Sequence, residues 1–203
     1  MIKILFSALF VGFWSISLTG FSQQVVISEV YGGGGNTGAT LKNDFIELYN
    51  PTSNPISLAG WSVQYASATG TSWQVTNLSG SIAAKGFYLI QQAQGAGGTV
   101  NLPTPDVIGT LALSATNGKV ALCNSTTALT GSNPSGGNLV DLVGFGTANG
   151  FEGTVAPALT NTTSLERKAN AASTASSMIS SGADALLGNG FDSNNNLADF
   201  ISR

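Results

Sequence analysis

The 203-residue chain contains no histidine and only one cysteine. Without histidine it cannot form a Ser-His-Asp or Cys-His nucleophile, and it lacks the side chain that most often serves as a zinc ligand or general base. The lone Cys123 excludes an intrachain disulfide. Its place in the alternating segment KVALCNS predicts a buried small hydrophobe rather than a reactive thiol.

Charge is scarce as well. Charged residues make up 8% of the chain, compared with about 25% in typical globular domains. Seven basic residues are scattered among ten acidic ones, and the formal charge is −3. Because no stripe of Lys and Arg is present to neutralise phosphates, we expect neither direct nucleic-acid binding nor attraction to an anionic membrane.

The one long apolar run lies at the N-terminus, where it follows Lys3, ends near Leu18 and precedes the small residue Ser22. This layout predicts a secretory signal peptide over residues 1–22. A retained anchor is the alternative, but the run falls short of the roughly 20 residues that cross a bilayer. We therefore expect residues 23–203 to form one secreted or cell-surface domain, with no membrane-spanning segment after cleavage.

Short alternating or β-branched segments recur along the remaining chain, separated by Gly, Pro, Asn and Ser. They predict strands at Val25–Val30, Phe45–Tyr49, Ile56–Leu58, Trp61–Tyr65, Trp73–Val75, Phe87–Gln91, Val107–Leu113, Lys119–Cys123, Leu139–Gly144 and Ser164–Arg167. Turn signals at this spacing are typical of an all-β sandwich or barrel. The Ala- and Ser-rich segment 169–190 holds either a short helix near Ala183–Leu187 or an irregular loop.

The stretch YGGGGNTG lies between two predicted strands. A phosphate-binding glycine loop requires a helix N-terminus directly after it, whereas here DFIELYN follows, a strand with Ile46 and Leu48 on one face. We therefore expect a connection between strands, in which the glycines are free to take positive φ. Any binding by this loop would use exposed backbone beside Asn36, Lys42 and Asn43.

Carboxylates are the remaining candidates for chemistry: Glu29, Asp44, Glu47 and Asp141. Paired carboxylates act in glycosidases, so a histidine-free hydrolase using Glu29 and Glu47 is one hypothesis. The simpler hypothesis is that these two glutamates pair with Arg167 or Lys168 across strands. No spacing specifies an acid/base pair, so we expect no enzyme, and we keep Glu47 and Arg167 as candidate binding residues.

Near the C-terminus, GFDSNNNLADF places oxygen-bearing side chains at Asp192, Asn194, Asn196 and Asp199. Alternating Asp and Asn oxygens are the ligands that calcium prefers, so these four are candidate calcium ligands. Their spacing matches the EF-hand loop only in part. The alternative is a set of Asx turns leading into a last strand.

Three aromatic residues, Trp61, Tyr65 and Trp73, lie in GWSVQYASATGTSWQV. Exposed aromatics on a sheet can stack on sugar rings, but tryptophans in sandwiches more often pack in the core. We expect the core position, with Trp61 the clearer case because LAGW begins a strand directly after a turn.

Six motifs together carry a family resemblance: ISEV at 27–30, DFIELYN at 44–50, LAGW at 58–61, GKVAL at 118–122, DLVGFG at 141–146 and TTSLERK at 162–168. From about residue 25 to residue 200 the chain resembles the lamin-tail domain in its bacterial exported form. The resemblance implies an immunoglobulin-like β-sandwich. It also implies a non-catalytic module, accessory to secreted or surface hydrolases.

The first functional hypothesis is therefore a secreted, monomeric, non-catalytic module that binds or tethers, with an unidentified protein or a cell-surface glycan as its partner. The second is a lectin-like glycan binder assisted by calcium. The third, weaker hypothesis is the histidine-free hydrolase.

Overall fold

The computed structural model describes residues 24–203, and the predicted signal peptide at residues 1–22 lies outside the described residues. Nearly all regular structure is β. The strands are β1 (Val26–Tyr31), β2 (Asn43–Tyr49), β3 (Ile56–Ser57), β4 (Ser62–Ala66), β5 (Gln74–Asn77), β6 (Ser81–Ile82), β7 (Phe87–Gln94), β8 (Val107–Ile108), β9 (Gly118–Cys123), β10 (Leu139–Phe145), β11 (Leu165–Arg167) and β12 (Phe200–Ser202), and the helix is α1 (Asn196–Asp199).

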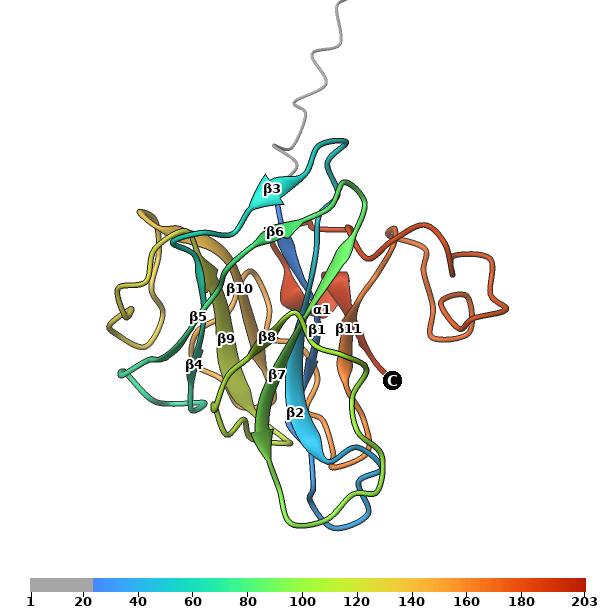
Figure 1. Cartoon of the computed structure of the whole chain (residues 1–203), viewed down its shortest axis with the longest axis horizontal. Helices are drawn as coiled ribbons and strands as arrows, with labels where there is room; N and C mark the ends of the chain where they lie inside the picture. The colour runs from blue at the N-terminus through green and yellow to red at the C-terminus, as the bar shows by residue number, and fades with distance from the viewer. Residues whose placement is uncertain (1–23) are drawn as a thin grey trace, which may run out of the picture.

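Two sheets pack face to face, as Figure 1 shows. One has six strands in the order β12-β11-β1-β2-β7-β8, and the other has four in the order β10-β9-β4-β5. A short β3-β6 ribbon lies at one end of the sandwich. The β7-β8 pair is parallel, whereas the other strand pairs of these sheets are antiparallel. The predicted immunoglobulin-like β-sandwich is confirmed.

The main core lies between the two large sheets and follows from alternation along each strand. Ile46 and Leu48 of β2 point inward as predicted, and they pack with Val120 and Leu122 of β9 in the same buried cluster. Each of these side chains is removed from water, a gain of about 1.5–3 kcal/mol apiece. Because one face of the six-stranded sheet packs on this core, its other face is turned outward.

A β-bulge in β1 decides which side chains reach that outward face. The pairing with β2 shifts between Ile27 and Glu29, so Ser28 is the extra residue. Strict alternation would place Ile27 and Glu29 on the same side. The bulge instead lets both Ile27 and Val30 enter the core while Glu29 turns outward.

The outer face of the four-stranded sheet is covered by the chain itself. Trp73, Ala121, Cys123 and Leu142 form a second buried cluster, against which Leu129 of the 124–138 loop packs. Cys123 is 1% exposed, and burial raises the pKa of its thiol to about 11. The prediction that Cys123 is buried is confirmed, and its low reactivity stays a prediction.

Several predicted boundaries were wrong. The segment predicted as a strand from Val107 to Leu113 pairs only as the two-residue β8, and the short strand β6 was missed. Residues 183–187 form turns rather than a helix, so the irregular alternative holds there. The helix among the described residues is α1, capped by the side chain of Asn195, and it is far too short and polar to cross a membrane.

Candidate functional site

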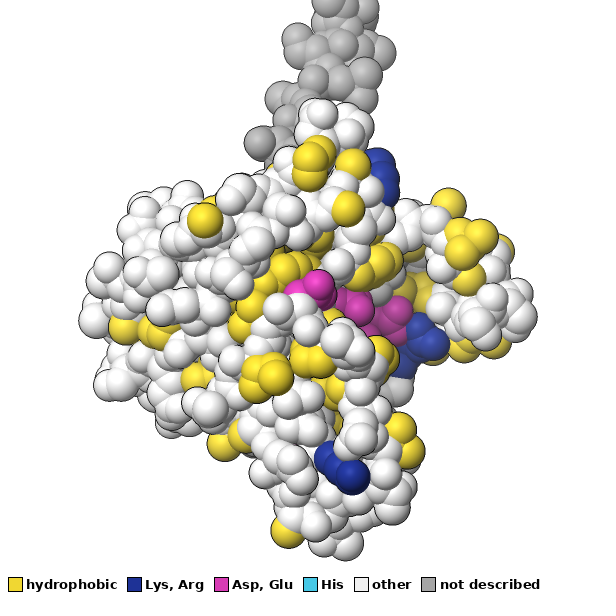
Figure 2. Space-filling model, viewed as in Figure 1, with side chains coloured by type: hydrophobic (Ala, Val, Ile, Leu, Met, Phe, Trp, Pro, Cys, Tyr) yellow, Lys and Arg dark blue, Asp and Glu magenta, His cyan; other side chains and the backbone are white. Residues whose placement is uncertain are grey.

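Three glutamates lie side by side on the outer face of the six-stranded sheet. Glu29 on β1 is the Cα partner of both Glu47 on β2 and Glu166 on β11. We call these three residues the glutamate row. Arg203, directly after β12, forms an ion pair with Glu166. In Figure 2 a band of acidic side chains crosses the middle of this face among hydrophobic ones and ends beside basic side chains.

Two carboxyl groups of the row, those of Glu29 and Glu47, have raised pKa values, mainly because they are buried. Burial raises the pKa of Glu29 to about 7; a hydrogen bond from Ser164 opposes the rise, while Glu166 and Glu47 add to it. Burial also raises the pKa of Glu47, against a hydrogen bond from Ser28 of 2.9 Å. The carboxyl of Glu29 is therefore partly protonated near neutral pH. A further cation beside it would favour the ionised form.

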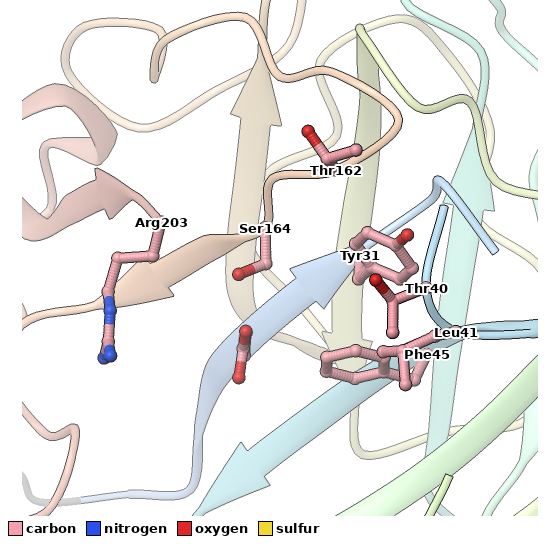
Figure 3. Close-up of a pocket in the computed structure, with 8 residues that line it drawn as sticks. Tyr31, Thr40, Leu41, Phe45, Thr162, Ser164 and Arg203 are labelled. Carbon is pink, nitrogen blue, oxygen red and sulfur yellow. The ribbon is translucent and has the colours of Figure 1, made fainter. Parts of the chain in front are cut away.

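A cavity of about 180 Å³ opens beside Glu29. Its walls are Glu29, Tyr31, Thr40, Leu41, Phe45, Thr162, Ser164 and Arg203. Figure 3 shows the rings of Tyr31 and Phe45 next to each other on one side, with Arg203 on the opposite side and Ser164 between them. The ring centroids of Tyr31 and Phe45 are 5.6 Å apart. The site thus combines a carboxylate, hydroxyl groups and an aromatic wall.

The predicted pairing of Glu29 and Glu47 with Arg167 or Lys168 was wrong. Glu166 points outward on β11, so its neighbour Arg167 points inward, where the side chain is 0% exposed. The Arg167 guanidinium bonds Asp141 Oδ2 at 2.7 Å and lies 4.4 Å from the ring centroid of Phe200. No external ligand reaches Arg167, so it is not a surface binding residue.

Arg167 and Asp141 satisfy the backbone of Ile27, where β1 has no partner on its β11 side. The pairing of β1 with β11 covers only Glu29 and Val30. At Ile27 the backbone N–H donates to Asp141 Oδ2 at 2.7 Å, and the carbonyl accepts from Arg167 Nε at 2.7 Å. The buried ion pair therefore replaces the missing strand contacts.

The candidate calcium ligands lie around the same guanidinium. Asp192 Oδ1 is 3.4 Å and Asp199 Oδ2 is 3.9 Å from Arg167 Nη1, and Asp199 also accepts from the backbone of Ser193 and Asn195. Asn196 is bonded to the backbone of β10, accepting from Gly144 N at 2.8 Å and donating to Leu142 O at 2.9 Å.

Asp192 accepts from the backbone N–H of Asn194, the Asx turn of the alternative hypothesis, and the predicted last strand follows as β12. Within residues 24–203, no group of three or more His, Cys, Asp or Glu side chains is arranged to hold a metal ion. Arg167 already supplies the positive charge beside these aspartates. Calcium binding stays a prediction, and its test is given below.

The backbone of the glycine-rich corner, residues 31–43, is tightly packed at its glycines rather than conformationally free. A Cβ added at Gly32 or Gly33 would lie 2.3 Å from the carbonyl oxygen of Ser114 or Asn161, and one at Gly34 would lie 2.0 Å from the carbonyl carbon of Asn43. Of the four consecutive glycines, only Gly35 has positive φ. Three of them are therefore required for close backbone approach, and the expectation of conformational freedom was wrong for those three.

The binding candidates on that corner differ in accessibility. Asn43 is 7% exposed and donates to Gln92 O at 3.0 Å, so its side chain is structural. Lys42 is partly exposed, and Asn36 is exposed and donates to Asn161 Oδ1 at 3.3 Å. Of the three candidates, only Asn36 and Lys42 therefore present side chains to solvent.

The aromatic residues singled out in the sequence all pack in hydrophobic clusters, Tyr65 and Trp61 in the main core and Trp73 in the second cluster. Tyr65 and Trp73 are each 6% exposed, and Trp61 packs against the main core while partly exposed. The core prediction is confirmed, although Trp73, not Trp61, is the more buried. Within residues 24–203 the most exposed aromatic side chain is Phe87, 47% exposed on the same face as the glutamate row.

Sequence reasoning missed most of the cavity. Tyr31, Phe45, Ser164 and Arg203 come from four separate segments, and no spacing connects them. The one available signal was local: Tyr31 lies two residues after Glu29 and Phe45 two before Glu47, so each pair shares a strand face.

The fold and the site together define the class, which is an immunoglobulin-like β-sandwich with a cavity of about 180 Å³ on one outer sheet face. Residues 21–147 match the family described as Lamin Tail Domain. The chain therefore belongs to the lamin tail domain family. Membership of this family favours a non-catalytic module.

A solved structure gives a second comparison. The crystal structure of a DUF4876 family protein from Bacteroides thetaiotaomicron VPI-5482 has a TM-score of 0.55 and 13% identity, over 88% of this chain and 70% of that chain. At that identity the likeness shows the fold alone. It covers a larger share of the chain than the family match over residues 21–147 does. No curated protein matches the chain.

Proposed function

We propose that the mature domain is a secreted, monomeric, non-catalytic module that binds a partner at the cell surface through the outer face of the six-stranded sheet. It would act as an accessory to a secreted or surface hydrolase, holding the enzyme near its target. The observation that carries the proposal is the contrast between the two outer faces. The four-stranded sheet is covered by residues 124–138, which also line cavities of about 290 and 330 Å³ on that side, whereas the six-stranded sheet presents the glutamate row, with a cavity of about 180 Å³ beside Glu29.

The chemistry of the row supports binding rather than turnover. Ser28 and Ser164 hydrogen-bond Glu47 and Glu29, and the chain contains no histidine that would complete a nucleophile. A broad screen of hydrolase substrates with the domain and its Glu47→Gln variant tests this point. Turnover that the substitution abolishes would establish the hydrolase alternative.

The binding proposal is tested with fluorescently labelled residues 23–203 on intact cells of the source organism. Phe87→Lys places a charge on the exposed aromatic of the proposed face, and we expect it to reduce binding about tenfold or more, the scale of a central contact. Thr126→Lys adds the same charge on the loop over the opposite sheet and should leave binding unchanged. Equal effects of the two substitutions, or no binding by the unmodified domain, would overturn the proposal.

The calcium-assisted glycan hypothesis separates from this one in a melting experiment. If Asp192, Asn194, Asn196 and Asp199 hold calcium, millimolar calcium raises the melting temperature, and a chelator abolishes glycan-array binding. If Arg167 serves in place of the ion, neither change occurs. Light scattering during size-exclusion chromatography should give the molar mass of one chain if the domain is a monomer.

A further inference from the structure

The cavity beside the glutamate row has spare hydrogen-bond acceptors. Within residues 24–203, the Glu29 carboxylate accepts one side-chain hydrogen bond, from Ser164. A carboxylate has about four lone-pair positions, so most of them are free to accept from a ligand. Thr40 and Ser164 contribute hydroxyl oxygens to the same walls. Tyr31 is already satisfied, because its hydroxyl donates to Asn161 O at 2.7 Å, so it presents its ring rather than a polar group.

The charges around the cavity do not balance. Glu29 faces Glu166 from β11, Glu47 from β2 and Arg203 from the end of β12, and Arg203 is already paired with Glu166. Asn189, which bonds Glu166 and Ser28, adds no charge. A second cation beside Glu29 would reduce the excess negative charge of the glutamate row.

The walls favour a slender organic cation. Ring faces attract cations, and the rings of Tyr31 and Phe45 line one side. An ammonium has three donors, which match the acceptors on Glu29, Thr40 and Ser164. A metal ion fits poorly, because Glu29 is the single carboxylate among the lining residues and hard cations take six to eight oxygen ligands.

We propose that this cavity binds the ammonium group of a lysine side chain from a protein partner, held by Glu29 against the rings of Tyr31 and Phe45. The inference deepens the proposed function and rests on it, since it gives the chemistry by which the face would recognise a partner. The volume of about 180 Å³ accommodates one such side chain, so a partner would present a single exposed lysine here.

The test uses the ¹⁵N-labelled domain, residues 23–203, titrated with Nα-acetyl-lysine methylamide and followed by NMR chemical shifts. We expect saturable shifts at Tyr31, Phe45 and Ser164, and no saturable shift with the Nε-acetylated form of the same compound. Glu29→Gln keeps the shape and removes the charge, and it should weaken binding about tenfold or more, because hydrogen bonds to a charged group are the strong ones. Glu152→Gln, in a different part of the fold, is the matched control and should change nothing.

Two further readouts separate recognition from a structural role. Arg203→Gln removes the competing cation and should tighten binding several-fold, the opposite sign to Glu29→Gln. Binding should also strengthen from pH 5.5 to pH 8, because Glu29 loses its proton in that interval while the lysine ammonium keeps its own. Equal binding of the Nε-acetylated compound, or weakening by both substitutions, would overturn the inference.

The outcomes for the two proposals are distinguishable. Cell binding without saturable shifts from the lysine compound would overturn the lysine inference and leave the face as the contact surface. Saturable shifts without cell binding would overturn the tethering function instead. Saturation by putrescine but not by the lysine compound would overturn the lysine assignment in favour of a free amine.

Discussion

Replacing Arg167 by Met is the sharpest test of what holds this sandwich together. The substitution removes the guanidinium that bonds Asp141 and the carbonyls of Ile27 and Phe191 at 2.7–3.0 Å. It leaves Asp141, 2% exposed, with a buried charge and no cation. Breaking a buried pair from one side costs about 3–5 kcal/mol, a large part of the roughly 5–15 kcal/mol that stabilises a domain.

Urea unfolding provides the measurement. With a slope of about 2 kcal/mol per molar urea, the midpoint of Arg167→Met should fall by about 2 M. Arg203→Met is the matched control, because its ion pair with Glu166 is partly exposed and should contribute no more than about 1 kcal/mol.

A double-mutant cycle then isolates the pair. Arg167→Met combined with Asp141→Leu removes the lone charge at residue 141, although Asp199 still loses its neighbouring cation, so the double variant should lose less than the sum of the single losses by about 1–3 kcal/mol. It should still be less stable than the original domain, because the N–H and carbonyl of Ile27 stay without partners. Additive losses, or a loss at Arg167 no larger than at Arg203, would refute the reasoning.

Three other predictions concern packing, pH and reactivity. Gly34→Ala should destabilise the domain by about 3 kcal/mol or more, because the new Cβ meets backbone at 2.0 Å, whereas Gly38→Ala, with open space around it and φ of +85°, should cost only about 1 kcal/mol; similar urea midpoints for the two would contradict this. The folded-state pKa values of Glu29 and Glu152, about 7 and about 8, lie above the ordinary value of 4.5, so the folded state holds these protons more tightly and stability is lost as pH rises from 4.5 to 8. Calorimetry should therefore give a higher melting temperature at pH 5 than at pH 8, with a smaller difference in Glu152→Gln, and a flat profile would argue against the raised values. Cys123 should resist a thiol reagent in the native state and react fully in urea, so that rapid native reaction would mean the loop over it opens.

Much of the fold was readable because alternation is a local signal. Ile46 and Leu48 identify the inward face of β2 without knowledge of any other strand, and Cys123 belongs to an alternating apolar run of the same kind. The misses have local causes too. The two-residue strand β6 is too short to show a period, and the strand predicted from Val107 pairs only over the two residues of β8. The bulge at Ser28 cannot be recognised from residues 25–30, where several alternations are equally possible.

The site was much less readable, because its members come from distant segments. Glu29 and Glu47 were identified as candidates but given the wrong partners, since sequence cannot tell that Arg167 points inward while Glu166 points outward. That choice depends on which residue of β11 meets the core. Asn43 and Arg167 were likewise proposed as contacts although packing buries both.

The sequence by itself thus determined the class of this protein: an all-β sandwich of the lamin tail domain family, without histidine chemistry and without a disulfide, because composition, alternation and motif order are properties of the chain alone. The tertiary structure decided the rest. The β1 bulge and the register of β11, β1 and β2 align three glutamates in one row, and the end of β12 brings Arg203 beside them. Such an alignment depends on strand register, which long-range packing sets, and for that reason the cavity could not be predicted from the sequence.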